Sequence, residues 1–296
     1  MKVLSKVFGA CSPKSCGQLF ASKLKIKGPL AKGEQFITLE DEYINKFDDI
    51  VIIGDVHGCY EELKELIDRV HADTPSKKAD KCLKIIVGDL VNKGPSSDKV
   101  LKLCVDKYPN SILSVRGNHD EVILKQYNRY KDGEKLDPKN KWVEALAPRY
   151  AEYLNILPYS IHIPGLKCII VHGGINPSLE EPHKTTPTEQ MVSMRHIVVE
   201  KHPKTGEPSY RCTKSDKEGI GWANFWPGPQ HVYFGHDAKK RLQDQHEFAT
   251  GLDTGCVYGD QLSYVYVKGA RKGQIAHVKA KKVYVPVSEE SKAKLY

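Results

Sequence analysis

The sequence lacks any apolar run near the roughly 20 residues that a membrane-spanning helix needs, which argues against an integral membrane protein. Its eight cysteines among 296 residues form no CxxC pair. A disulfide scaffold is therefore not indicated, and reduced thiols in the cytosol are expected. Hydrophobic residues make up 40% of the chain and charged residues 28%, proportions too apolar for a disordered protein. The length fits one large α/β domain or two small ones.

Acidic residues are missing from one end of the chain and scarce at the other. Residues 1–33 contain seven lysines and no acid, and residues 268–296 contain eight basic residues against two acidic ones. The body between them carries 30 basic and 35 acidic groups, so the net charge of +8 belongs to the ends. A general nucleic-acid-binding surface on the body is not indicated. The basic ends are interpreted as solubilising tails, with guidance of a polyanion towards the body as the alternative.

The pattern divides the chain into three parts. Residues 1–33 lack periodicity and predict a flexible basic arm, residues 34–287 a single domain, and residues 288–296 a frayed tail. The arm has no apolar stretch long enough for a secretory signal. A cytoplasmic location is expected. A mitochondrial presequence is the alternative because acids are absent, although such segments favour Arg and this one has none.

Short β-branched runs alternate with amphipathic segments in the body, a pattern typical of a mixed α/β protein. The polar residues 201–221 predict a surface loop. A capping box at Thr186–Glu189 predicts the start of a short helix. The predicted helices cover residues 61–70, 121–130, 141–155 and 187–194. The predicted strands cover residues 49–53, 83–87, 111–115, 159–163, 167–171, 231–234, 262–267, 274–278 and 283–287.

Five short polar clusters directly follow predicted strands. They are Gly54–Gly58 (GDVHG), Gly88–Gly94 (GDLVNKG), Gly117–Asp120 (GNHD), Val171–Gly174 (VHGG) and Gly235–His236. Ligands bind at the carboxyl ends of strands in open α/β sheets, because the loops there converge on a crevice. Carboxylate, amide and imidazole donors without thiolate suit Mn, Fe, Zn, Co or Mg, and argue against a structural zinc site.

These clusters closely resemble the signature of the calcineurin-like metallophosphoesterases of the phosphoprotein phosphatase superfamily, over residues 50–270. The resemblance implies an α/β/β/α sandwich of two mixed sheets flanked by helices, with two divalent metal ions at one edge. It also implies that His119 is the general acid and that Arg116 holds phosphate oxygens. The implied metal ligands are Asp55 and His57 for the first ion, Asp89 as the bridge, and Asn118, His172 and His236 for the second ion.

The implied chemistry agrees with these residue types. Two divalent ions can clamp the oxygens of an in-line displacement and supply a bridging hydroxide that attacks phosphorus. Manganese is the expected metal, with Fe, Zn, Co and Mg as alternatives. Neutral imidazole and amide ligands leave the centre slightly positive, and a phosphate dianion is attracted to such a centre.

Two departures from the protein-phosphatase pattern indicate the kind of bond that is cleaved. Asn92 and Lys93 stand where that branch has Asp and Arg. Asn92 can accept a hydrogen bond from His119 but adds no negative charge, so the pKa of His119 should be lower. Lys93 cannot reproduce the bidentate grip of Arg on phosphate. A phosphoanhydride tolerates a weaker acid than a phosphoserine does, because its leaving group is better, so the site favours P–O–P cleavage.

Two motifs nearer the C-terminus also favour P–O–P cleavage over the protein-phosphatase branch. Gly251–Cys256 (GLDTGC) and Phe234–Asp237 (FGHD) resemble bacterial symmetrical diadenosine tetraphosphatases and, most closely, the ApaH-like phosphatases. The expected substrates are dinucleoside polyphosphates or inorganic polyphosphate, and members of the family also act on phosphoproteins and capped RNA. Trp222, Phe225 and Trp226 are interpreted as a packed cluster, with stacking on a substrate base as the alternative.

Two other functions remain open from the sequence. A protein serine/threonine phosphatase would use the same dinuclear centre, and a non-enzymatic protein would bind polyanions through its lysine-rich arm. Neither a membrane partner nor an oligomeric state is indicated by the sequence.

Overall fold

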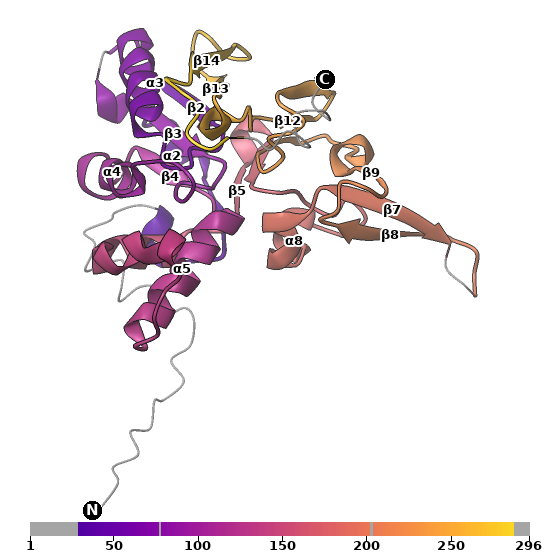
Figure 1. Cartoon of the computed structure of the whole chain (residues 1–296). Helices are drawn as coiled ribbons and strands as arrows, with labels where there is room; N and C mark the ends of the chain where they lie inside the picture. The colour runs from indigo at the N-terminus through magenta and orange to yellow at the C-terminus, as the bar shows by residue number, and fades with distance from the viewer. Residues whose placement is uncertain (1–28, 77, 202–203, 287–296) are drawn as a thin grey trace, which may run out of the picture.

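The computed structural model describes residues 29–76, 78–201 and 204–286 (Figure 1). Two mixed sheets form its centre. Strand order is β14-β13-β2-β3-β4 in the five-stranded sheet and β1-β5-β6-β10-β12-β11 in the six-stranded sheet. Helices flank both sheets, so the predicted α/β architecture is confirmed. A smaller sheet, β8-β7-β9, extends away from this body on the right of Figure 1.

The strands are short, as the sequence pattern predicts. The five-stranded sheet contains β2 (Asp49–Ile53), β3 (Cys82–Ile86), β4 (Ile112–Ser114), β13 (Gln261–Lys268) and β14 (Ile275–Lys279). The six-stranded sheet contains β1 (Phe36–Thr38), β5 (Ser160–Ile163), β6 (Cys168–Val171), β10 (His231–Phe234), β11 (Gln243–His246) and β12 (Ala249–Gly251). The third sheet contains β7 (His196–Lys201), β8 (Pro208–Thr213) and β9 (Ile220–Gly221).

The helices include short 3₁₀ turns and one π-helical turn. The α-helices are α2 (Asp41–Ile44), α3 (Tyr60–Asp73), α4 (Ser97–Lys102), α5 (Asn118–Lys131), α6 (Pro148–Ile156), α7 (Pro182–Thr185) and α8 (Thr188–Ser193). The 3₁₀ turns are η1 (Pro29–Lys32), η2 (Ala79–Lys81), η4 (Pro138–Ala145), η5 (Pro164–Leu166), η6 (Trp222–Phe225) and η7 (Cys256–Tyr258), and η3 (Leu103–Lys107) is the π-helical turn.

Parallel strands carry the early site clusters to one edge. β2 pairs in parallel with β3, and β3 with β4. All five residues of β2 and of β3 are buried, which explains why both strands are mostly apolar, with Asp49 and Lys84 as the exceptions. In the other sheet β10 pairs in parallel with β6. The carboxyl ends of these strands therefore present their loops together.

Four local predictions are corrected by the structure. The predicted helix over 141–155 is two segments, because Leu146 and Ala147 are extended before Pro148, which starts α6. Pro187 rather than Thr186 precedes α8, since the Thr186 hydroxyl accepts from the Asn176 amide at 2.9 Å. Residues 283–286 form no strand, and 287 lies outside the described residues. The predicted loop over 201–221 forms much of the third sheet.

The ends of the chain lie mostly outside the described residues. Of the predicted arm, Pro29–Lys32 forms η1 and Leu30 is buried in the core, so ordered structure begins before residue 34. The predicted tail, residues 288–296, is not described. Within the described ranges, no helix is both long enough and apolar enough to cross a membrane.

Lys84, in the middle of β3, is a buried cation that should reduce stability. Its side chain is 0% exposed, and Nζ donates to the Ala79 carbonyl at 3.0 Å. Burial lowers its pKa to about 8. The folded protein therefore binds fewer protons than the unfolded chain between about pH 8 and about pH 10.4, and stability should rise with pH across that window.

Lys84→Met should consequently increase the free energy of unfolding at pH 7 by about 1–3 kcal/mol. Urea unfolding between pH 7 and 10.5 measures this, and the variant should also lose the rise in stability above pH 8. Lys102→Met, at an exposed position of α4, is the matched control and should change stability little. A less stable Lys84→Met protein at pH 7 would contradict the expectation.

Candidate metal centre

The six predicted ligands come together at the shared edge of the two large sheets. Each follows a strand closely: Asp55 and His57 follow β2, Asp89 follows β3, Asn118 starts α5 after β4, His172 follows β6, and His236 follows β10. Asp55, His57, Asp89 and His172 are each at most 3% exposed. Side chains separated by up to 181 positions in sequence thus form one buried cluster.

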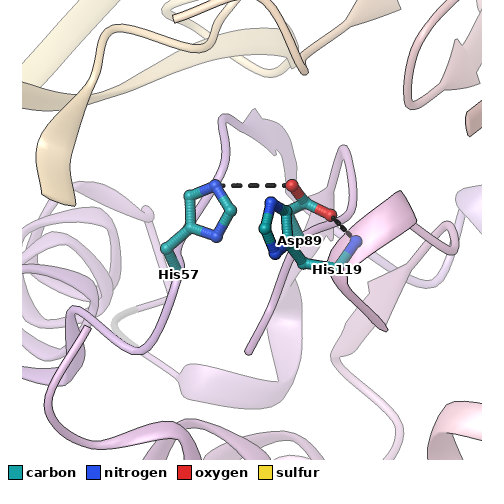
Figure 2. Close-up of side chains that lie close together, drawn as sticks. All are labelled: His57, Asp89 and His119. Atoms are coloured by element: carbon teal, nitrogen blue, oxygen red, sulfur yellow. Dashed lines mark hydrogen bonds and ion pairs between the residues drawn. The ribbon is translucent and has the colours of Figure 1, made fainter. Parts of the chain in front are cut away.

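Asp89 is the central member of this cluster (Figure 2). Its Oδ2 lies 3.3 Å from Nε2 of His57, and its Oδ1 lies 3.4 Å from Nε2 of His172. The backbone N–H of His119 also donates to Oδ1 at 2.8 Å, as the second dashed line in Figure 2 marks. The two carboxylate oxygens therefore face ligands from different strands, as a bridging ligand requires.

Asn118 lies between the two histidines that are predicted to bind the second ion, His172 and His236. Its Oδ1 lies 3.0 Å from Nε2 of His172 and 3.0 Å from Nδ1 of His236. Asp55 accepts from the backbone N–H of His236 at 3.1 Å. These contacts bring the donor atoms of both sheets to one point.

Backbone carbonyls fix the tautomer of each histidine ligand. Nδ1 of His172 lies 2.9 Å from the Val87 carbonyl, and Nε2 of His236 lies 3.2 Å from the Ser193 carbonyl. Because a carbonyl can only accept, these ring nitrogens carry the protons. The other nitrogen of each ring then presents its lone pair to the cluster, an arrangement typical of metal-ligating histidine.

The electrostatics of the cluster fit cations. Burial raises the pKa of Asp89 to about 7, and burial together with Asp253 and Asp89 raises the pKa of Asp55 well above its usual range. Burial lowers the pKa of His172 to about 3 and keeps its imidazole neutral. A bound cation would favour the ionised form of these buried carboxyl groups, and a neutral imidazole can offer its lone pair to a metal ion.

Lys93 places a positive charge at the cluster. Its Nζ lies 3.0 Å from Nε2 of His57 and 5.4 Å from the ring centroid of Tyr258. The ammonium thus occupies the lone-pair side of a predicted metal ligand, where a cation is expected. The donor set, its charge and this ammonium agree that the six residues suit divalent ions, with Asp55, His57, Asp89, Asn118, His172 and His236 as the ligands.

Left-handed backbone is concentrated in these loops. His57, Asp89, Asn92, Lys93 and His236 have φ between +45° and +73° although none is glycine. Such conformations cost free energy and persist where the surroundings impose them, commonly at functional sites. Two positions in these loops leave no room for a side chain and therefore require glycine. A Cβ at Gly117 would lie 2.1 Å from Oδ1 of Asp89, and a Cβ at Gly235 would lie 2.0 Å from Oδ1 of Asp55.

In the hydrogen bond between Asn92 and His119, Asn92 is the donor, whereas the sequence predicted that it is the acceptor. Its Oδ1 accepts from the backbone N–H of Lys93 at 2.9 Å, which fixes the amide orientation because that N–H can only donate. Nδ2 therefore faces Nδ1 of His119 at 2.9 Å, and the amide donates to the ring. Burial, followed by nearby Lys93, lowers the pKa of His119 to about 3. The predicted direction of the pKa is retained, with burial rather than Asn92 as its largest cause.

Arg116 has partners of its own. Nη2 donates to the Asn155 carbonyl at 2.6 Å and Nη1 to the Tyr159 hydroxyl at 3.1 Å, with the guanidinium 4.9 Å from the Tyr159 ring. Nε is buried without a partner. Holding phosphate would therefore require Arg116 to exchange existing hydrogen bonds, so its role remains a prediction.

The sequence interpretation missed two buried acids. Asp253 is 5% exposed, and burial raises its pKa to about 6 beside the cluster. Oδ2 of Asp120 accepts from the Asp89 amide at 3.0 Å and from the Gly117 amide at 2.9 Å, and Oδ1 accepts from the Leu90 amide at 3.0 Å. Asp120 thereby holds the loops after β3 and β4 together. Asp253 lies in the GLDTGC segment, and Asp120 ends GNHD, so both had a local signal.

The aromatic residues before β10 pack as a cluster, as the preferred interpretation expects. Trp222 is 2% exposed, and its ring meets Phe234 at 4.9 Å edge to face. The indole N–H of Trp226 donates to the Gln230 carbonyl at 2.7 Å. Cys59 and Cys256 are likewise buried, and their thiols lie near the carboxylate of Glu62.

Comparisons with known proteins agree with this geometry. The zinc-dependent endopolyphosphatase of Saccharomyces cerevisiae is 25% identical over 83% of this chain and 82% of its own length. The symmetrical bis(5′-nucleosyl)-tetraphosphatase of Coxiella burnetii RSA 331 is 28% identical over 73% of this chain and 88% of its own length. A crystal structure described provisionally as a diadenosine tetraphosphatase superposes with a TM-score of 0.68 at 30% identity, covering 83% of this chain and 98% of that one.

The family model for calcineurin-like phosphoesterases matches residues 49–240, which include all six predicted ligands. Members of this family are hydrolases that depend on a dinuclear metal centre. The match, the converging donor atoms and the related proteins together show that this chain is a metallophosphoesterase of the calcineurin-like phosphoesterase family.

Proposed function

We propose that the protein hydrolyses phosphoanhydride bonds, in dinucleoside polyphosphates or in inorganic polyphosphate. Two divalent ions held by the six ligands would supply Lewis acidity and an activated water. Manganese is the proposed metal, and zinc is the main alternative because one relative is named for its zinc dependence. The names of the relatives support an anhydride substrate.

The observation that carries this proposal is the hydrogen bond from Asn92 to His119. Because the amide donates to Nδ1, the neutral ring carries its proton on Nε2. A ring in this state can donate a hydrogen bond to a leaving oxygen but is a poor source of a full proton. An alkoxide leaving group needs that proton. A phosphate leaving group does not, so the site suits P–O–P bonds better than phosphoserine.

Lys93 is the cation that we propose as the main contact for phosphate oxygens. Its ammonium already lies at the cluster, 3.0 Å from His57. As a flexible point charge it can follow a phosphate without the fixed fork of Arg. Arg116 is proposed as a second contact, available once its bonds to Asn155 and Tyr159 exchange.

A substrate panel tests the proposed function. Protein loaded in turn with Mn, Zn, Co and Mg is incubated with diadenosine tetraphosphate, inorganic tripolyphosphate and a phosphoserine peptide. We expect kcat/KM for at least one anhydride to exceed that for the peptide by about tenfold or more, since general acid catalysis contributes roughly 10²–10⁴-fold where it is needed. Faster turnover of the peptide than of both anhydrides would instead support a protein phosphatase.

A further inference from the structure

A cavity lies beside the loop that carries Lys93. It has a volume of about 410 Å³, within the range of about 300–1,000 Å³ that is typical of small-molecule sites. Its walls come from the loop that follows Lys93, from the start of α4 and from the end of η4. The residues that line it are Gly94, Pro95, Ser97, Asp98, Trp142, Ala145 and Leu146.

Backbone contacts join this cavity to the site. The N–H of Gly94 donates to the His57 carbonyl at 2.9 Å, and the N–H of Ser96 donates to the Gly58 carbonyl at 3.1 Å. The Ser97 hydroxyl accepts from the N–H of Asn92 at 3.0 Å. One wall of the cavity is thus formed by residues that directly follow Asn92 and Lys93 in the same loop.

Packing of η4 relates the cavity to the helix that carries His119. η4, which provides Trp142, packs against α5, and His119 is the second residue of α5. The hydrogen-bond donor to the leaving oxygen must face the leaving group. A leaving group that accepts from His119 would lie near the start of α5, and the cavity adjoins the loop after Lys93 and η4, which packs against α5.

The lining chemistry selects a base over a phosphate. Trp142, Leu146 and Pro95 provide an apolar surface, and an indole stacks on any nucleobase. Of the seven lining residues only Asp98 is charged, and its carboxylate would repel a further phosphate but accept from an exocyclic amino group. We propose that this cavity binds the base of the leaving nucleotide, stacked on Trp142.

This inference rests on the proposed function and narrows it. A substrate with a nucleoside at its leaving end gains the contacts of the cavity, whereas inorganic polyphosphate meets only Asp98 there. The protein should therefore prefer dinucleoside polyphosphates to inorganic polyphosphate of similar charge.

Binding of adenosine 5′-monophosphate to the metal-free protein tests the base site without turnover. Stacking should quench tryptophan fluorescence, and Trp142→Phe should bind the nucleotide with the quench largely removed. Trp226→Phe is the matched control and should keep the quench. A quench that survives Trp142→Phe, or no binding at all by the intact protein, would overturn the base site whatever the enzyme hydrolyses.

Kinetics of the metal-loaded enzyme provide the second test. In Trp142→Ala, the ratio of kcat/KM for diadenosine tetraphosphate to that for tripolyphosphate should fall about tenfold, mainly through KM. Asp98→Ala, at an exposed position that should not affect folding, should lower the same ratio by a smaller factor. Equal losses on both substrates would show that Trp142 acts structurally and would overturn the inference. Preference of the wild type for a phosphopeptide would refute the proposed function, while the fluorescence assay would still decide the base site.

Discussion

Asp89→Asn is expected to reduce hydrolysis by about 10³-fold or more. Asp89 presents its two oxygens to histidines of different strands, 3.3 Å from His57 and 3.4 Å from His172. An amide has one acceptor oxygen and no charge, so it cannot bridge two cations. The lost charge stabilisation of several kcal/mol corresponds to a rate loss of this size.

The fold should survive this change. In the metal-free protein burial raises the pKa of Asp89 to about 7, whereas the pKa of Asp in an unfolded chain is about 3.9. At any pH above about 3.9 the charged form of Asp89 therefore reduces the stability of the folded, metal-free protein. Removing the charge should therefore leave the melting temperature of the metal-free protein unchanged or higher at pH 7. Bound metal, measured by elemental analysis, should fall below the wild-type amount. Asp68→Asn, the same change at an exposed ion pair, is the control and should keep full activity and metal.

Wild-type activity in Asp89→Asn would mean that Asp89 does not serve as the bridge. Loss of activity with a large fall in the melting temperature of the metal-free protein would also contradict the expectation, because it would assign Asp89 a structural role.

The sequence was sufficient to predict that the six proposed ligands lie together, because each belongs to a short motif at the end of a strand. β2 and β3 are buried along their whole length and are mostly apolar, so both strands were predictable, and parallel pairing brings their carboxyl ends together. Each motif could therefore be placed in space without knowledge of the loops. The same logic places His172 and His236 at the ends of β6 and β10.

Segments whose form depends on distant partners were not predictable in this way. β8 has no buried residue and only Tyr210 and Cys212 as larger apolar side chains, so its pattern is weak, and its pairing with β7 makes it a strand. Residues 283–286 (VYVP) form an apolar run that suggests a strand, but the backbone N–H groups of Tyr284 and Val285 both donate to the Val257 carbonyl instead of to a strand. Asp120 and Asp253 are of a type common in turns, and only tertiary structure shows that both are buried.

The orientation of Asn92 was equally inaccessible from sequence. Its backbone has φ of +73°, and in this conformation Oδ1 reaches the N–H of the next residue, Lys93. That local bond leaves only Nδ2 for His119. Either amide group could have faced the ring, so a pattern of residue types could not decide between acceptor and donor.

Asn92→Asp is expected to increase kcat/KM for a phosphoserine peptide by about 10–100-fold, with little change for diadenosine tetraphosphate. One carboxylate oxygen can keep the bond to the Lys93 N–H, and the other can only accept from His119. Nδ1 of His119 must then carry a proton, and the negative charge stabilises the imidazolium form. Aspartate also tolerates the left-handed backbone of this position. Parallel assays of both substrates over a range of pH measure the change.

Asn92→Ala separates the charge from the mere loss of the amide donor. It removes the hydrogen bond to Nδ1 without supplying a carboxylate, so peptide hydrolysis should not rise in this variant. If Asn92→Asp gave no gain on the peptide, the state of His119 would not be what limits phosphomonoester cleavage. A gain in Asn92→Ala as large as in Asn92→Asp would mean that the amide donor itself obstructs the acid. The expected gain in Asn92→Asp alone would show that one atom at residue 92 separates an anhydride hydrolase from a monoester phosphatase on the same set of metal ligands.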